Sequence, residues 1–184
     1  MKIENTKIKD LKIITPDIFS DERGYFFEMF HTKKFKEMEI PINFVQDNQS
    51  FSKYRTIRGL HYQIGEFAQG KLVHVVQGKI LDVAVDIRFS SPTFGKYFSI
   101  ELSDSNQKFI WIPPGFAHGF SVLSETAVMF YKCTAVYSPT HERGILFNDP
   151  DLNIDWKIEN PLVSEKDRKN SNFREIEKDF VFRK

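Results

Sequence analysis

The chain has 184 residues, a formal net charge of +1, 41% hydrophobic and 28% charged residues, and one cysteine. Lys and Arg are scattered rather than clustered, so we expect no nucleic-acid partner. We expect no membrane span and no secretory signal, because the sequence contains no apolar run of sufficient length. A single cysteine excludes an internal disulfide and favours the reducing cytoplasm.

The N-terminal part predicts two strands and a helix. Residues 11–15 and 25–30 have strand-like composition, with a polar turn between them. Residues 32–38 predict a short helix with Thr32 as its N-cap. The 19 phenylalanines favour a sheet-rich core, because flat aromatic side chains pack well on pleated surfaces.

Residues 44–52 mix strand formers with amides. Gln46, Asn48 and Ser50 alternate onto one side of this predicted strand. Such a row could hydrogen-bond a ligand, but an ordinary exposed strand face is the favoured interpretation of the pattern.

The centre of the chain, residues 56–88, carries the clearest chemical signal. Arg58, His61 and Lys71 lie close together in the sequence, and two strand-like segments meet at Gly78. Between residues 81 and 87, apolar side chains hold the odd positions and mainly polar ones the even positions. This alternation predicts a strand with one core face and one polar face.

Further strands are predicted at residues 97–102, 109–112, 119–123 and 127–137, and residues 172–179 could form a short helix in the charged tail. Short strands with turn signals every eight to twelve residues or so are typical of antiparallel sandwiches and barrels. We therefore expect an all-β fold, an antiparallel jelly-roll barrel with a few short peripheral helices, in one domain covering residues 1–184.

A metal site has weak support. The Pro-x-Gly-x-x-His pattern at residues 113–118 is similar to the second histidine motif of metal-binding cupins. Their first motif needs a His-x-His pair, but the residue two positions after His61 is Gln63, and the chain has no such pair. One imidazole with scattered partners does not make a metal site, so we expect none.

Acid–base chemistry fits the central segment better. Histidine titrates near neutral pH, which makes His61 the natural candidate for a base, although a lone strand histidine is more often structural. Lys71 and Arg58 add positive charge that suits an anion or a developing oxyanion. Tyr131 could donate a proton, or it could simply pack in the core. Nucleophilic catalysis lacks support, because nothing in the sequence activates Cys133.

Several long motifs follow one another in the chain. They are Arg-Gly-Leu-His-Tyr-Gln (58–63), the strand pair at 71–88, Ser-Ser-Pro-Thr-Phe-Gly (90–95), Ile-Pro-Pro-Gly-Phe-Ala-His-Gly-Phe (112–120), Tyr-Lys (131–132), Tyr-Ser-Pro (137–139) and Asn-Asp-Pro (148–150). In this order they resemble the dTDP-4-dehydrorhamnose 3,5-epimerase family, from about residue 10 to residue 170.

The resemblance implies a cupin-type jelly roll, a homodimer with strand exchange across the interface, and neither metal nor other cofactor. It implies epimerisation of a nucleotide-linked 4-keto-6-deoxy sugar at the two carbons beside the ketone. By position, His61 resembles the family's base, Asp167 the carboxylate that orients this base, Tyr131 the acid on the opposite face, and Lys71 the group that stabilises the enolate oxygen.

The resemblance also implies substrate-binding residues. Arg23 and Glu28 resemble nucleotide contacts supplied across the dimer. Further substrate contacts are implied for Gln46, Asn48, Arg58, His118, Tyr137, Glu142 and Lys166.

The chain departs from the family pattern at residues 54–57, in the loop 64–70 and in the tail after Asp167, which lacks the usual proline. Asp82 and Asp86 therefore stay open as alternative partners of His61, although a structural role in their strand is slightly favoured.

Three alternatives to a 3,5-epimerase of a dTDP-linked sugar remain at this point. One is an epimerase that inverts C3 or C5 alone, or that acts on a GDP- or CDP-linked sugar or a heptose. Another is a sugar-binding module without catalysis. The third is a metal cupin, which would carry stoichiometric metal and lose activity with chelators.

Overall fold

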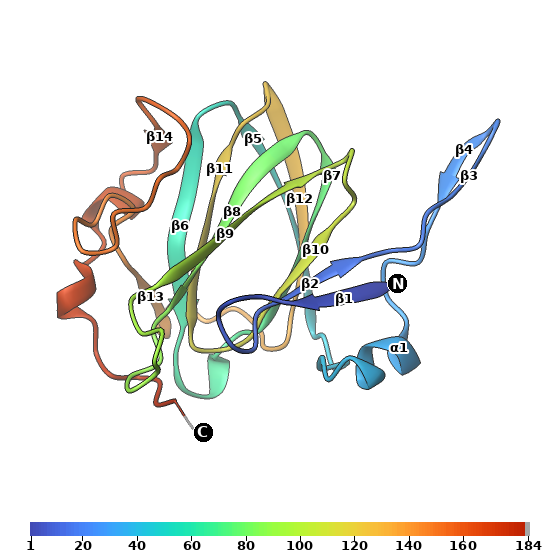
Figure 1. The fold of residues 1–184 in the computed structure, drawn as a ribbon. Coiled ribbons are helices and arrows are strands. Elements are labelled where there is room, and N and C mark those ends of the chain that lie inside the picture. Colours follow the sequence, from blue (N-terminus) through green and yellow to red (C-terminus); the bar gives the residue numbers. More distant parts are fainter. Residues whose placement is uncertain (183–184) are drawn as a thin grey trace.

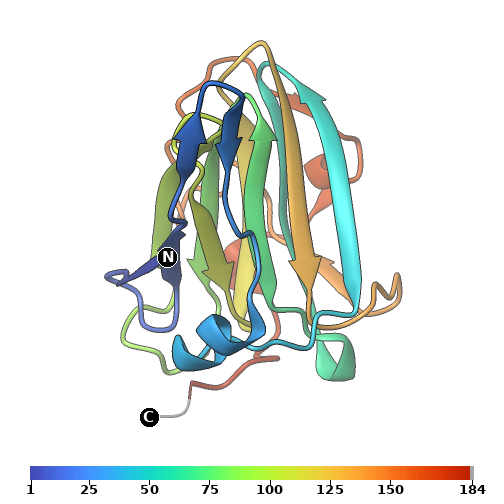
Figure 2. The same cartoon turned by 90° about the vertical axis from the view of Figure 1, so that its right-hand side faces the viewer.

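Two facing β-sheets form the body of the molecule in a computed structural model that describes residues 1–182 (Figure 1). The first sheet has the strand order β1 (Lys2–Asn5), β2 (Lys12–Thr15), β10 (Phe109–Ile112), β7 (Lys71–Gln77), β12 (Thr126–Cys133) and β5 (Gln46–Lys53). Figure 2 looks onto its outer face, with helix α1 (Thr32–Glu37) at the lower edge.

The second sheet has the order β13 (Glu142–Gly144), β6 (Thr56–Gln63), β11 (Phe116–Val122), β8 (Lys79–Asp86) and β9 (Tyr97–Ser103). Strand β14 (Leu162–Val163) pairs with β6 in parallel, whereas the other named strand pairs are antiparallel. Residues 1–182 also contain three short 3₁₀ helices: η1 (Gly65–Phe67), η2 (Asp167–Lys169) and η3 (Phe173–Glu175). The predicted antiparallel jelly-roll barrel is thus confirmed.

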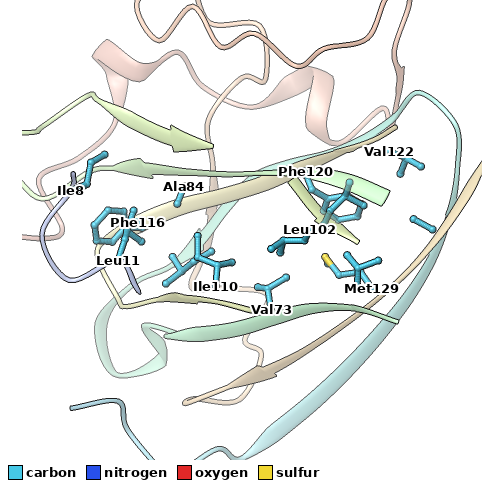
Figure 3. Close-up of a cluster of buried hydrophobic side chains, with 14 residues drawn as sticks. Ile8, Leu11, Val73, Ala84, Leu102, Ile110, Phe116, Phe120, Val122 and Met129 are labelled. Carbon is cyan, nitrogen blue, oxygen red and sulfur yellow. The ribbon is translucent and has the colours of Figure 1, made fainter. Parts of the chain in front are cut away.

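The main hydrophobic core lies between the two sheets (Figure 3). Because side chains alternate across a strand, each strand sends every second residue inward. Val73, Ile110 and Met129 enter from the first sheet, and Ala84 and Phe120 from the second. This core fixes the distance between the sheets and therefore the width of any cavity between them.

A second core covers the outer face of the second sheet. The odd-numbered side chains of β8, predicted as a core face, pack there against Phe147, Leu152 and Trp156 from the C-terminal part of the chain. The even face of β8 points into the barrel, so Asp82 and Asp86 are fully buried rather than exposed. Both carboxylates are tolerated inside because each has a cationic or imidazole partner.

The N-terminal third differs from the sequence prediction in two places. Strand β4 (Gly24–Phe26) ends early, because Phe27 and Phe30 both pack against a third core cluster, and a strand would direct them to opposite faces. Helix α1 begins at Thr32 as expected, but His31 occupies the N-cap position and no side chain caps the helix. The Thr32 cap is therefore wrong.

The later elements also differ. Strand β12 ends at Cys133, four residues before the predicted end, and residues 134–141 form a loop. The predicted helix at 172–179 is wrong, since only η3 is helical there. Phe173, Ile176 and Phe180 instead spread over the second core cluster, and this packing overrides their helix-like spacing.

Strands β3 (Phe19–Asp21) and β4 form a hairpin that projects away from the barrel (Figure 1). No helix among residues 1–182 is long and apolar enough to cross a membrane.

Candidate active site

A cavity of about 560 Å³ lies between the two sheets, near strands β5 and β6. Side chains from both sheets and from the C-terminal segment line it. Seven of the predicted site residues are among them: Arg58, His61, Lys71, His118, Tyr131, Lys166 and Asp167.

His61 and Asp167 form the closest polar pair in this cavity. His61 Nε2 lies 2.6 Å from Asp167 Oδ1, and the Gly59 amide donates to Asp167 Oδ2 at 3.2 Å. Burial alone would raise the pKa of Asp167, but the hydrogen bonds from His61, Gly59 and Ser164 outweigh it and lower that pKa overall. Asp167 therefore stays ionised, and Nδ1 of His61 is the ring nitrogen left for a substrate.

Gly59 permits this arrangement. At Gly59, β6 approaches β11 so closely that an added Cβ would lie 2.6 Å from Gly119 Cα. The φ angle of Gly59, +126°, also favours glycine at this position. The other candidates for pairing with His61 have different partners. Asp82 lies 2.8 Å from His118 Nε2, and Asp86 binds Arg88. The structure thus pairs His61 with Asp167.

Lys71 and Tyr131 reach the cavity from the first sheet, which faces the sheet that carries His61. Burial lowers the pKa of Lys71, although the charges of Cys133, Asp82 and Glu142 oppose this shift. Burial raises the pKa of Tyr131, so its phenol is protonated at neutral pH. The cavity therefore holds an imidazole on one sheet and a protonated phenol on the other.

Predicted binding residues surround this centre. Arg58 donates to Ser52 Oγ at 3.0 Å. Lys166, which lines the cavity, forms an ion pair with Glu142, and Glu142 accepts a 2.7 Å hydrogen bond from Tyr137.

The amide row on β5 is also connected to this region. Gln46 donates to Asn48 at 3.0 Å and accepts from the Tyr137 amide at 2.7 Å. Both amides share one face of β5, as the alternation predicted, but this face is half-buried, so the favoured interpretation of an exposed strand face is wrong. Neither amide lines the cavity itself.

Arg23 and Glu28 do not join the other site residues in this chain. Arg23 lies in the projecting hairpin and pairs with Asp21. Glu28 follows the hairpin and pairs with Lys34. Neither residue lines the cavity.

Residues 162–164 form a wall of the cavity that was not predicted from the sequence. Strand β14 has only two residues, too few for any periodic signal. One local signal was available, because Ser164 and Asp167 are three apart and the Ser164 hydroxyl accepts the Asp167 amide at 3.1 Å. Among residues 1–182, no three His, Cys, Asp or Glu side chains are arranged to hold a metal ion.

A jelly-roll barrel whose cavity combines an oriented histidine, a buried lysine and a protonated tyrosine defines a class of acid–base enzymes. The family model for dTDP-4-dehydrorhamnose 3,5-epimerase matches residues 5–175. The chain belongs to this family, as its motifs predicted.

Individual relatives agree with this result. The chain is 52% identical to a dTDP-4-dehydrorhamnose 3,5-epimerase of Shigella flexneri over 91% of this chain and 93% of that protein. A second relative is a dTDP-6-deoxy-D-glucose-3,5-epimerase from Legionella pneumophila, whose crystal structure is a complex with dTDP-4-keto-L-rhamnose. The two sequences are 46% identical, and the structures match with a TM-score of 0.95 over 100% of this chain and 99% of that one. A more distant relative, 34% identical over 91% of this chain and 82% of its own length, is a dTDP-4-dehydrorhamnose 3-epimerase of Streptomyces niveus.

Proposed function

We propose that this protein inverts C3 and C5 of dTDP-4-dehydro-6-deoxyglucose to give dTDP-4-dehydrorhamnose. Membership of the family and the keto-sugar bound to the Legionella relative support this reaction. The observation that carries the proposal is the His61–Asp167 pair in the same cavity as Tyr131, on facing sheets.

The chemistry begins with removal of a proton from a carbon beside the ketone. His61 takes this proton on Nδ1, while Asp167 holds Nε2 and stabilises the imidazolium that forms. The electron pair of the broken C–H bond moves into the ring, and the ketone oxygen becomes an enolate oxygen. Lys71 stabilises this oxygen with its positive charge, which is worth more in an enclosed cavity than in water.

Inversion requires that the new proton arrives from the opposite face of the carbon. Tyr131 is the proposed donor, because it lies on the sheet opposite His61 and its pKa is raised above the ordinary value. After donation, the phenolate recovers a proton from solvent and His61 releases one, so the step is balanced at each carbon. The residues carry out the reaction without a metal or other cofactor.

We further propose a cytoplasmic homodimer in which the β3–β4 hairpin reaches the partner's cavity. In one chain Phe19, Tyr25 and Phe26 of this hairpin are 64%, 61% and 66% exposed, which is unusual for aromatic side chains of a monomer. An apolar groove of about 280 Å³ adds uncovered surface on the outer face of the first sheet. Exchange of the hairpins would also bring Arg23 to a cavity, which it does not reach in its own chain.

Proton NMR in D₂O, without added metal, tests the reaction. Incubation of the wild-type protein with dTDP-4-dehydro-6-deoxyglucose should remove the signals at C3 and C5, and His61→Asn should slow this loss by about 10²- to 10⁴-fold while the fold is retained. A His61→Asn protein with wild-type exchange would contradict the assignment of the base.

An epimerase that inverts a single carbon is the second candidate, because the Streptomyces niveus relative is a 3-epimerase. In the same experiment such an enzyme would exchange one carbon and leave the other unchanged. Binding without exchange at either carbon would favour a different nucleotide sugar or a non-catalytic module, and GDP- and CDP-linked keto sugars would then be tested.

A further inference from the structure

A second carboxylate–histidine pair lies in the cavity wall. His118 Nε2 is 2.8 Å from Asp82 Oδ2, and Asp82 is completely buried. Strands β11 and β6 pair in a register that places His118 directly opposite His61. Two imidazoles from neighbouring strands therefore line one cavity, and each is held by its own carboxylate.

Asp82 is poorly satisfied for a fully buried carboxylate. Its Oδ1 has no hydrogen-bond partner among residues 1–182. Asp86 lies four residues later on the same face of β8 and differs from Asp82 in its hydrogen bonding. As expected of a purely structural buried carboxylate, it accepts hydrogen bonds through both oxygens, from Arg88, Ser91 and Thr93. Leaving a buried polar atom unpaired lowers stability, so the burial of Asp82 is better explained by what this carboxylate does to His118 in the cavity wall.

The contact with Asp82 fixes the orientation of the His118 ring. A carboxylate oxygen accepts, so Nε2 is the ring nitrogen that donates to Asp82 and, in a neutral ring, the one that carries the proton. No side chain or backbone group of residues 1–182 hydrogen-bonds Nδ1, and His118 lines the cavity. Nδ1 is therefore a hydrogen-bond acceptor that is available to a ligand.

We propose that Asp82 is a positioning residue, which holds His118 so that Nδ1 accepts a hydrogen bond from a hydroxyl of the bound sugar. This inference rests on the proposed function, and it narrows the role of His118. An acceptor nitrogen cannot bind the oxygens of a diphosphate, which are acceptors themselves. His118 therefore recognises the sugar and not the diphosphate.

Asp82→Asn is the informative variant because it has nearly the same shape. Its amide can donate to Nε2, and this contact would move the ring proton to Nδ1 and turn the acceptor into a donor. We expect kcat/KM to fall by about 10- to 100-fold, as is usual when the group that orients a functional histidine is replaced. Inhibition by dTDP alone should change less than about twofold, since dTDP has no sugar ring at the position of the substrate's hexose.

A double-mutant cycle with His118→Gln separates positioning from general structural damage. If Asp82 acts through His118, Asp82→Asn should add little to the loss already caused by His118→Gln. Additive losses, or a weaker affinity for dTDP in Asp82→Asn, would overturn the proposal. Asp149→Asn is the matched control, because Asp149 is a buried carboxylate outside the cavity and should affect stability without changing kcat/KM.

The wild-type protein provides a test that does not depend on any variant or on turnover. In ¹⁵N NMR spectra of protein labelled in its histidines, His118 should carry its proton on Nε2 and not on Nδ1. A proton on Nδ1 would overturn the proposal even if the enzyme is active. Failure of the proposed function gives a distinct result: wild-type protein would show no deuterium exchange at C3 or C5, whichever nitrogen of His118 carries the proton.

Discussion

At the residue scale, Asp167 determines how His61 can act. It is 3% exposed and holds Nε2, so the nitrogen facing the substrate has a fixed orientation. We expect Asp167→Asn to keep the fold but lower kcat by about 10²-fold or more, because an amide can impose the wrong tautomer on His61. Deuterium exchange at C3 and C5 measures the effect. Wild-type exchange in this variant would show that His61 needs no carboxylate.

Lys71 should set the alkaline limit of activity. The proposed enolate needs a protonated amine, and burial lowers the pKa of Lys71 below its usual value of 10.5. A lowered pKa means that the proton is lost earlier as pH rises, so kcat should decline at a pH below that of a free lysine. Tyr131 cannot explain this limb, because burial moves its pKa upward from 10.0.

The groups that face Lys71 allow a sharper version of this test. Asp82 and Glu142 both oppose the effect of burial on its pKa, as does Cys133 opposite it on β12. Removing the Asp82 charge in Asp82→Asn should therefore move the alkaline limb to lower pH. A limb that stays in place would mean that another group limits activity. A pH profile of kcat between about pH 6 and 10 measures both predictions.

At the element scale, the close approach of β6 and β11 places His61 beside His118. Gly59 makes this approach possible, and Gly24 is a matched control. The φ angles of Gly59 and Gly24 are +126° and +128°, so both residues have the same unusual backbone conformation. Of the two, only Gly59 has neighbours within 4 Å of the position that a Cβ would take. Alanine at either site should cost about 1–3 kcal/mol for the unusual backbone conformation. Gly59→Ala should lose a further 1–3 kcal/mol or so, because its Cβ would clash with the backbone of Gly119. Urea unfolding compares the two variants, and equal losses would contradict the clash.

The strands of the barrel could be predicted because their pattern is local. Period-two alternation located β8 and put the amides of β5 on one shared face, but it favoured an exposed face, whereas that face is half-buried. The even face of β8 was harder to interpret, since a row containing Asp82 and Asp86 resembles a solvent-exposed surface. The free-energy cost of burying these carboxylates is offset by partners that the strand pattern does not show: His118 for Asp82, and Arg88, Ser91 and Thr93 for Asp86.

The C-terminal segment could not be derived from local patterns. Asp167 lies 106 residues from His61, and only the family resemblance pointed to it. Likewise, the spacing of Phe173, Ile176 and Phe180 suggested one helix, but these side chains pack on the outer face of the second sheet from a chain that is helical only in η3. Contacts over such separations depend on the whole fold, and a single sequence does not display them.

At the scale of the whole molecule, the projecting hairpin exposes aromatic side chains that contacts within residues 1–182 leave largely uncovered, and the proposed dimer would cover them. The double variant Tyr25→Ser/Phe26→Ser should weaken association, because it removes two large exposed aromatic side chains from the proposed interface. Sedimentation velocity should then show a shift toward monomer. Val181→Ser is the control, since Val181 is also 63% exposed but forms a β-bridge with Phe89, outside the hairpin.

Exchange of the hairpins predicts that two inactive variants can restore activity together, whereas a cavity contained in one chain does not predict this. Arg23→Ala and His61→Asn should each inactivate the protein, but mixing and re-equilibrating them should restore about a quarter of wild-type activity. In a mixed dimer, the chain with intact His61 receives the intact Arg23 of its partner, so one of the two cavities is complete. If Arg23 served its own chain's cavity, both cavities of the mixed dimer would lack one residue and no activity would return. The assay therefore distinguishes a site completed by the partner subunit from a site contained in one chain.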